Sequence, residues 1–201
     1  MLPAGFIYLA MAIGLYGAVG YVRATWRDEV SPNRVTWVLW GVEGIMSFVV
    51  EVQQHVGTSS LMTLTLGLIP IAVVGASFKN PHSAWKLGGF DIFCGLLSLA
   101  GMIFWAFINQ PTVALLSFVV ADHVAALPTV RKSWLEPERE SSRAFFMGSL
   151  NCTITVLTLK TVTTAGFAFP GTIMIMNFFI GLLIVTKAGP RFRQRYRASV
   201  K

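Results

Sequence analysis

The sequence predicts an all-α integral membrane protein with seven transmembrane helices. Of its 201 residues, 54% are hydrophobic and only 12% are charged, whereas soluble domains carry about a quarter charged residues. The mean hydropathy is +0.64. The apolar stretches approach the ~20 residues that a helix needs to cross roughly 30 Å of hydrocarbon, and they lack the alternation of an outer-membrane strand.

The predicted spans follow one another with short loops, and no segment remains for a soluble domain. They cover residues 3–22, 34–54, 60–78, 90–108, 111–130, 144–164 and 168–187. The first span has no basic residue before it, and Arg23 and Arg27 follow it, so we expect it to stay in the mature protein rather than to act as a signal peptide. Asp91 is expected to act as a helix-start residue of the fourth span.

Positive charges predict the orientation. With the N-terminus outside and the C-terminus in the cytoplasm, 15 of the 16 Lys and Arg residues fall in cytoplasmic segments, and only Lys160 lies toward the outside. Short basic loops are retained in the cytoplasm. The net charge of +7 is therefore attributed to topology and to anionic lipid headgroups, and a nucleic-acid partner is not expected.

An internal repeat explains how the spans are related. At an offset of 108 residues, Pro3 matches Pro111 at the start of a span, Trp26 matches Trp134 after one, and Lys79 matches Lys187 at the end of another. Both Trp residues can lie at the inner interface only if an even number of spans separates them. The pattern therefore predicts a 3+1+3 parallel repeat of three-helix bundles, related by an axis along the membrane normal.

This repeat divides one membrane domain, residues 1–201, into four predicted parts. The first three-helix repeat covers residues 1–80, a linker helix covers 81–110, the second three-helix repeat covers 111–190, and a basic cytoplasmic tail covers 191–201.

The seven-span 3+1+3 pattern, with "ALPTVRKSWLEPERESSRAFF" at the junction of the fifth and sixth spans, resembles the PQ-loop superfamily, which includes SWEET and SemiSWEET sugar transporters, cystinosin-like transporters and KDEL receptors. Pro128 occupies the place of the second Pro-Gln pair, and Gly20 holds the equivalent place in the first half. The resemblance implies a solute carrier, a membrane carboxylate used for proton coupling, and a binding Asn in the third helix of a repeat, a pattern that Asn177 matches.

Ionisable side chains inside a membrane need a partner, a water-filled cavity or a proton. Glu43 lies nine residues into the second span, roughly 13 Å along the axis at 1.5 Å per residue, and Asp122 and His123 lie midway along the fifth. We expect Glu43 and Asp122 to bind the solute and couple protons. The alternatives are that Asp122 hydrogen-bonds a neighbouring helix and that His123 is a neutral interhelical linker or a third proton-coupling residue.

Aromatic and amide side chains supply the other candidates. Trp37, Trp40 and Glu43 share one stripe of the second span, where Trp40 is deep enough to stack on a solute and Trp37 fits an interfacial aromatic belt. Asn151 and Asn177 are expected either to hydrogen-bond the solute or to join helices.

Four residues are predicted to bend helices as gating or hinge positions, although kinks also occur in static bundles: Gly20, Pro70, Pro128 and Pro170. The mixed-charge "EPERES" loop is expected to form a solvated salt-bridge cluster that acts as an inner gate latch. Cys94 and Cys152 fall inside spans and suggest neither a disulfide nor a metal site.

No catalytic motif is present, so an enzyme is not predicted, and no metal or other cofactor is expected. The sequence favours a multi-pass transporter of the bacterial inner membrane, carrying a small polar or cationic solute such as a sugar, amino acid or vitamin by alternating access. The alternative is a receptor or accessory subunit on the same scaffold. Expected partners are the solute, the lipid bilayer and either a second copy of the chain or a membrane protein.

Overall fold

The computed structural model describes residues 1–79, 85–105, 107 and 110–199, and this part of the chain is helical, without strands. Its α-helices are α1 (Phe6–Trp26), α2 (Arg34–Gln53), α3 (Ser60–Lys79), α4 (Gly89–Trp105), α5 (Pro111–Leu135), α6 (Ser142–Thr158), α7 (Thr164–Thr186) and α8 (Ala188–Ser199). The predicted boundary near residue 81 and the predicted span end at residue 108 lie outside the described residues.

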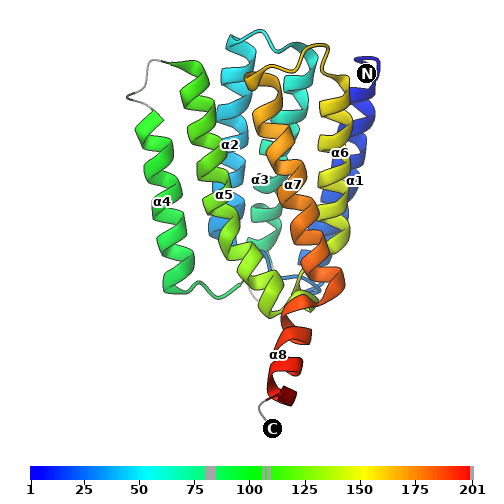
Figure 1. The fold of residues 1–201 in the computed structure, drawn as a ribbon, viewed down its shortest axis with the longest axis vertical. Helices are drawn as coiled ribbons and strands as arrows, with labels where there is room; N and C mark the ends of the chain where they lie inside the picture. Colours follow the sequence, from blue (N-terminus) through cyan, green and yellow to red (C-terminus); the bar gives the residue numbers. More distant parts are fainter. Residues whose placement is uncertain (80–84, 106, 108–109, 200–201) are drawn as a thin grey trace.

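Helices α1 to α7 stand side by side, and each runs opposite to the one before it (Figure 1). The N-terminal end of the bundle is the end at which α1 begins and α2 finishes. The C-terminal end is the opposite one, from which α8 projects away from the other helices (Figure 1). Helices α1, α3, α5 and α7 therefore share one direction.

Two groups of three helices have the same internal packing. In the first, α3 contacts both α1 and α2, and in the second, α7 contacts both α5 and α6. The groups meet where α1 packs against α6 and where α2 packs against α5, while α4 packs on α5 and α2. Each helix of one group thus has a counterpart with equivalent neighbours in the other.

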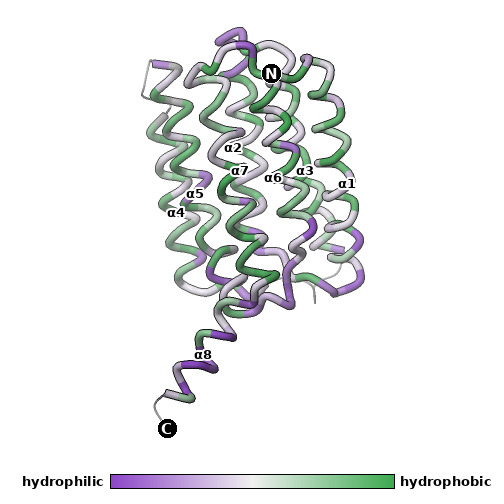
Figure 2. Tube along the Cα trace, turned by 45° about the vertical axis from the view of Figure 1, so that its right-hand side comes forward, coloured by the Kyte–Doolittle hydropathy of each residue, from purple (hydrophilic) through white to green (hydrophobic). Residues whose placement is uncertain are grey.

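Four segments of the described chain are long and apolar enough to cross a membrane: Phe6–Trp26, Arg34–Gln53, Gly57–Lys79 and Thr164–Thr186. A shorter apolar helix covers Gly89–Phe104. The hydropathy tube shows apolar residues along the bundle and polar ones in α8 (Figure 2). The chain therefore has the helices of a multi-pass membrane protein, although fewer than seven meet this test, because α4 and α6 have only 17 residues each and α5 carries Asp122, Arg131 and Lys132.

Polar caps fix where α2 and α6 begin. The side chain of Asn33 accepts hydrogen bonds from the backbone N–H groups of Val35 and Thr36 at 3.1 and 3.4 Å. Ser141, 108 residues later, accepts one from the N–H of Ala144 at 3.4 Å. Such caps satisfy donors that have no partner inside the helix. Asn33 also donates to the carboxylate of Asp91 at 2.8 Å, which ties α4 to α2.

Asp91 confirms its predicted role as a helix-start residue, because its carboxylate also accepts from the backbone N–H of Gly88 at 2.6 Å, at the beginning of α4. Its side chain is buried rather than interfacial, with 1% of the residue exposed.

Several predicted ends are wrong by a turn. Helix α1 continues to Trp26 and α5 to Leu135, because helix-forming basic residues extend a helix beyond its apolar part. Helix α6 ends at Thr158 instead of residue 164, and Thr163 then caps α7 by accepting from the N–H of Gly166 at 3.1 Å. The tail, expected only as a basic segment, forms α8.

Candidate functional site

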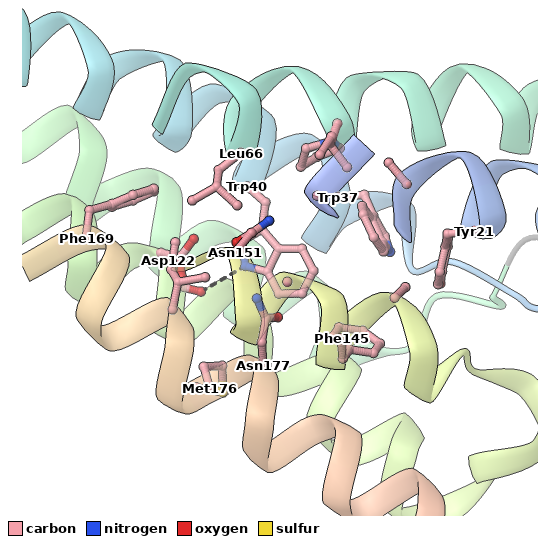
Figure 3. Close-up of a pocket in the computed structure, with 17 residues that line it drawn as sticks. Tyr21, Trp37, Trp40, Leu66, Asp122, Phe145, Asn151, Phe169, Met176 and Asn177 are labelled. Atoms are coloured by element: carbon pink, nitrogen blue, oxygen red, sulfur yellow. Dashed lines mark hydrogen bonds between the residues drawn. The ribbon is translucent and has the colours of Figure 1, made fainter. Parts of the chain in front are cut away.

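A cavity of about 90 Å³ lies between the two three-helix groups (Figure 3). Its walls come from α1, α2 and α3 on one side and from α5, α6 and α7 on the other, and α4 contributes no lining residue. Most of the lining side chains are apolar or aromatic. The cavity is therefore shared by both groups and excludes the helix between them.

Three polar side chains of the second group face this cavity. Asp122 comes from α5, Asn151 from α6 and Asn177 from α7, and all three line the same space (Figure 3). Asp122 is 4% exposed and Asn151 is 1% exposed. Three residues that the sequence placed on separate spans are thus brought together at one site.

The aromatic wall is larger than the sequence predicted. Trp40 lines the cavity, and its indole N–H donates to the backbone carbonyl of Asp122 at 3.3 Å. Trp37 is also a buried lining residue, so its assignment to an interfacial aromatic belt is wrong. Its ring centroid lies 5.3 Å from that of Trp40 and 4.7 Å from that of Tyr21. A continuous aromatic row therefore leads from the site toward the C-terminal end.

Two glycines make room for the amide side chains. A Cβ atom at Gly14 would lie 2.5 Å from Nδ2 of Asn151, and one at Gly148 would lie 2.7 Å from Nδ2 of Asn177. Both distances are shorter than any van der Waals contact, so a larger residue would displace the amide. The polar lining depends on these close approaches of α1 to α6 and of α6 to α7.

Glu43 does not line the cavity, contrary to its expected place in a shared solute site. Its side chain is fully buried, and its Oε1 accepts a hydrogen bond from the hydroxyl of Ser98 on α4 at 2.6 Å. Within the described chain, its Oε2 has no hydrogen-bond partner. The carboxyls of Glu43 and Asp122 are nevertheless electrostatic neighbours across the contact of α2 with α5.

His123 is held by its own helix. Its Nδ1 lies 2.8 Å from the carbonyl oxygen of Val119 and 3.8 Å from a carboxylate oxygen of Asp122. The ring is about one-third exposed and lies outside the cavity lining. The geometry thus gives His123 no direct path to a bound solute.

The predicted hinge residues occupy different surroundings. Pro70 lines the cavity from inside α3, and Pro128 is buried within α5. Pro170 lies seven residues into α7 rather than at the beginning of a span, because that helix starts earlier than predicted. Gly20 borders a shallow surface groove with Arg23 and Arg143.

A buried ion pair closes the C-terminal end of the bundle. The ammonium group of Lys132 donates to a carboxylate oxygen of Glu140 at 2.7 Å, and neither side chain is exposed. Tyr21 donates its hydroxyl to the other carboxylate oxygen at 2.9 Å, and Lys132 also donates to the backbone carbonyl of Ser31. The expectation of a solvated cluster is wrong for Glu140, because Tyr21 and the preceding helix cover it.

The rest of the loop is solvated as predicted. Glu138 pairs with Lys187 at 2.8 Å, and Arg139 pairs with Asp28 at 3.6 Å, with these side chains between 41% and 61% exposed. The pKa of Glu138 is lowered chiefly by the hydrogen bond from Lys187.

Sequence reasoning also missed Glu51. It lies near the C-terminal limit of the predicted second span, yet it is 1% exposed and faces inward, with Thr63 of α3 within hydrogen-bonding reach of its carboxyl. The spacing Glu43, Ser47, Glu51 places all three on one helical face and would have identified it.

Among the described residues, no group of three or more His, Cys, Asp or Glu side chains is arranged to hold a metal ion. Cys94 and Cys152 are free and buried. Comparison with protein-family models, with curated proteins and with solved structures gives no match.

Proposed function

We propose that this chain is a membrane transporter that crosses the bilayer seven times and moves a small polar or cationic solute by alternating access. Its N-terminus lies outside and its C-terminal tail in the cytoplasm of a bacterial inner membrane. The observation that carries the proposal is the buried cavity between two equivalent three-helix groups, with an acidic side chain, Asp122, in its wall.

The packing of the helices supports the repeat. Both groups place their third helix between the first two, both run in the same directions, and they meet through equivalent pairs, α1 with α6 and α2 with α5. Internal repeats with a site at their interface are typical of secondary transporters. This arrangement is also the one implied by the resemblance to the PQ-loop superfamily.

The lining suits a solute with both a polar and an apolar face. Asp122 can accept hydrogen bonds or balance a cation, Asn151 and Asn177 can donate and accept, and Trp40 can stack on a ring or an ammonium group. A buried carboxyl that exchanges a proton is a common coupling device in transporters. Solute recognition and proton binding would then share Asp122.

The cavity volume describes a closed conformation. Ligand sites usually occupy about 300–1,000 Å³, whereas this cavity of about 90 Å³ holds roughly three waters. The Lys132–Glu140 pair blocks the C-terminal end, and the backbone N–H of Leu2 donates to the carbonyl of Leu157 at 2.8 Å at the other end. Transport requires the two groups to move apart at one end at a time.

A receptor or accessory subunit is the second candidate. The small cavity and the buried ion pair favour it, since a bundle that never opens would bind a partner protein through its outer surface instead. The two candidates differ in whether the cavity admits a solute.

The test is an uptake screen in proteoliposomes across sugars, amino acids and vitamins, with and without a pH gradient. We expect one solute class to accumulate, with stimulation by the gradient. Asp122→Asn should abolish that stimulation and lower uptake by at least about tenfold, because a lost charge-assisted hydrogen bond costs about 1.5–3 kcal/mol.

Asp28→Asn is the matched control, since it makes the same chemical change at a partly exposed position that pairs with Arg139. Its uptake should equal that of the unmodified chain. Unchanged uptake and unchanged pH dependence in Asp122→Asn would contradict the proton role, and no uptake of any solute would favour the receptor.

A further inference from the structure

A row of buried polar side chains runs along one face of α2. Ser47 is one turn from Glu43, and Glu51 is one further turn along, so that about 6 Å of helix axis separates each from the next. All three residues are at most 1% exposed. The row ends at Gln54, the C-cap of α2 at the N-terminal end of the bundle, where the chain is partly exposed.

Each member of this row carries a polar atom with no hydrogen-bond partner in the described part of the protein: Oε2 of Glu43, Oγ of Ser47, Oε1 of Glu51 and Nε2 of Gln54. Leaving a buried polar group without a partner costs free energy, so such atoms are rare and need an explanation. Four of them at successive turns of one helix face point to a shared purpose.

The surroundings connect this row to the cavity. Glu43 is the electrostatic neighbour of Asp122, which lines the cavity. Helix α4 contributes the hydroxyl of Ser98 to Glu43, and α3 contributes Thr63 beside Glu51. The row therefore extends from the cavity wall, through the interior, to one end of the bundle.

Few other titratable groups face the row. Helix α5 brings Asp122 and its neighbour His123, and α4 carries Asp91 and Cys94 closer to the C-terminal end. Helix α3 carries only Lys79, at its last residue, and α7 has no titratable side chain. Glu51 is thus the one carboxyl between Glu43 and the N-terminal end of α2.

We propose that Gln54, Glu51, Ser47 and Glu43 form a proton path from the N-terminal end of the bundle to Asp122. This inference rests on the proposed function and gives its proton a route. In each transfer, a carboxylic acid gives a proton to the next hydroxyl or carboxylate and takes one from the side it came from, so that charge is conserved. Because one helical turn exceeds a hydrogen bond, water bridges successive members.

The path makes the coupling one-sided. Toward the C-terminal end, the same face of α2 continues to Thr36, whose hydroxyl also has no hydrogen-bond partner within the described residues, but no carboxyl lies between Glu43 and Thr36. Protons should therefore reach Glu43 and Asp122 from the N-terminal end, which is the outer side in the proposed topology, and not from the end closed by Lys132 and Glu140.

The experiment follows the carboxyl C=O absorption of Glu43 and Asp122 by infrared difference spectroscopy, with no solute present. The bands are assigned by their loss in Glu43→Gln and Asp122→Asn. Vesicles with an enclosed C-terminus are selected by their failure to bind through a C-terminal affinity tag. The outside medium is then acidified rapidly, and protonation is timed.

We expect protonation in the unmodified chain and a slowing of at least about tenfold, equivalent to about 1.4 kcal/mol in the barrier, in both Glu51→Gln and Ser47→Ala. Thr36→Val is the matched control, because it removes another buried, unpartnered hydroxyl from the same face of α2 on the far side of Glu43. It should leave the rate unchanged. Ser47→Thr, which retains the hydroxyl, should restore the rate if Ser47→Ala impairs folding.

Equal rates in all variants, equal slowing by Thr36→Val, or no protonation in the unmodified chain would each overturn the path. These outcomes are separate from those of the uptake screen. Uptake that depends on Asp122 survives if the path is wrong, and the infrared result is obtained whether or not a solute is transported.

Discussion

Burial separates two glutamates that lie two residues apart in one loop. Glu140 is fully buried against Lys132 and Tyr21, whereas Glu138 is exposed beside Lys187. An exposed ion pair contributes little to stability, because solvent screens it. A buried pair is costly to break, because the remaining charge is left without compensation in the interior.

Glu140→Gln should therefore destabilise the protein by about 3–5 kcal/mol, since the amide leaves the ammonium group of Lys132 buried and unneutralised. Thermal unfolding in detergent measures this effect. Glu138→Gln is the matched control and should leave the unfolding temperature within error. Equal effects of the two changes would show that Glu140 is not buried in the folded protein.

Residue types were more predictable than the directions in which side chains point. Asp122, Asn151 and Asn177 stand out in the sequence because polar groups are rare inside apolar spans, and all three line the cavity. Whether Glu43 faces the cavity or α4 depends on the rotation of α2 about its axis. Packing against neighbouring helices sets that rotation, and one sequence does not contain it.

At the scale of helices, α2 and α3 approach each other through a pair of glycines. A Cβ atom at Gly44 would lie 2.6 Å from the Cα of Gly67, and one at Gly67 would lie 2.8 Å from the backbone nitrogen of Ile45. Small residues allow this kind of backbone approach in membrane bundles. The approach holds α2 in the orientation that places Trp40 in the cavity and Glu43 beside Ser98.

Gly44→Ala should cost about 1–3 kcal/mol of stability, because the added methyl group meets backbone atoms that cannot move without separating the two helices. Gly75→Ala, in α3, is the control, since a Cβ atom there meets nothing within 4 Å. That change should be neutral or stabilising by up to about 1 kcal/mol, as expected from helix propensity. Thermal unfolding distinguishes them, and a neutral Gly44→Ala would contradict the close approach.

Helix starts were predictable where a cap was present. Arg34 was correctly placed at the beginning of α2, one residue after the capping Asn33. Helix ends were less predictable, because apolar length measures how much of a helix suits hydrocarbon and not how far the helix continues. The cap of α7 at Thr163 was available in the sequence, but the Thr-rich segment around it obscured the signal.

Across the whole molecule, equivalent positions of the two halves carry different chemistry. Glu43 and Asn151 are 108 residues apart, as are Gly14 and Asp122. Glu43 meets Asp122 where α2 packs on α5, and Gly14 meets Asn151 where α1 packs on α6. If the halves arose by duplication, one contact between them has become acidic and suited to protons, while the other has become an amide site suited to a polar solute.

The central claim is that the cavity between the halves opens alternately to each side. The most direct measurement places a single cysteine in its wall, by Ala18→Cys in a chain whose Cys94 and Cys152 are replaced by alanine, and labels it with a membrane-impermeant maleimide applied from one side at a time. The account predicts labelling from both sides, with Glu140→Gln raising the rate from the C-terminal side and lowering it from the other. Labelling from neither side, or a rate that Glu140→Gln leaves unchanged, would contradict it.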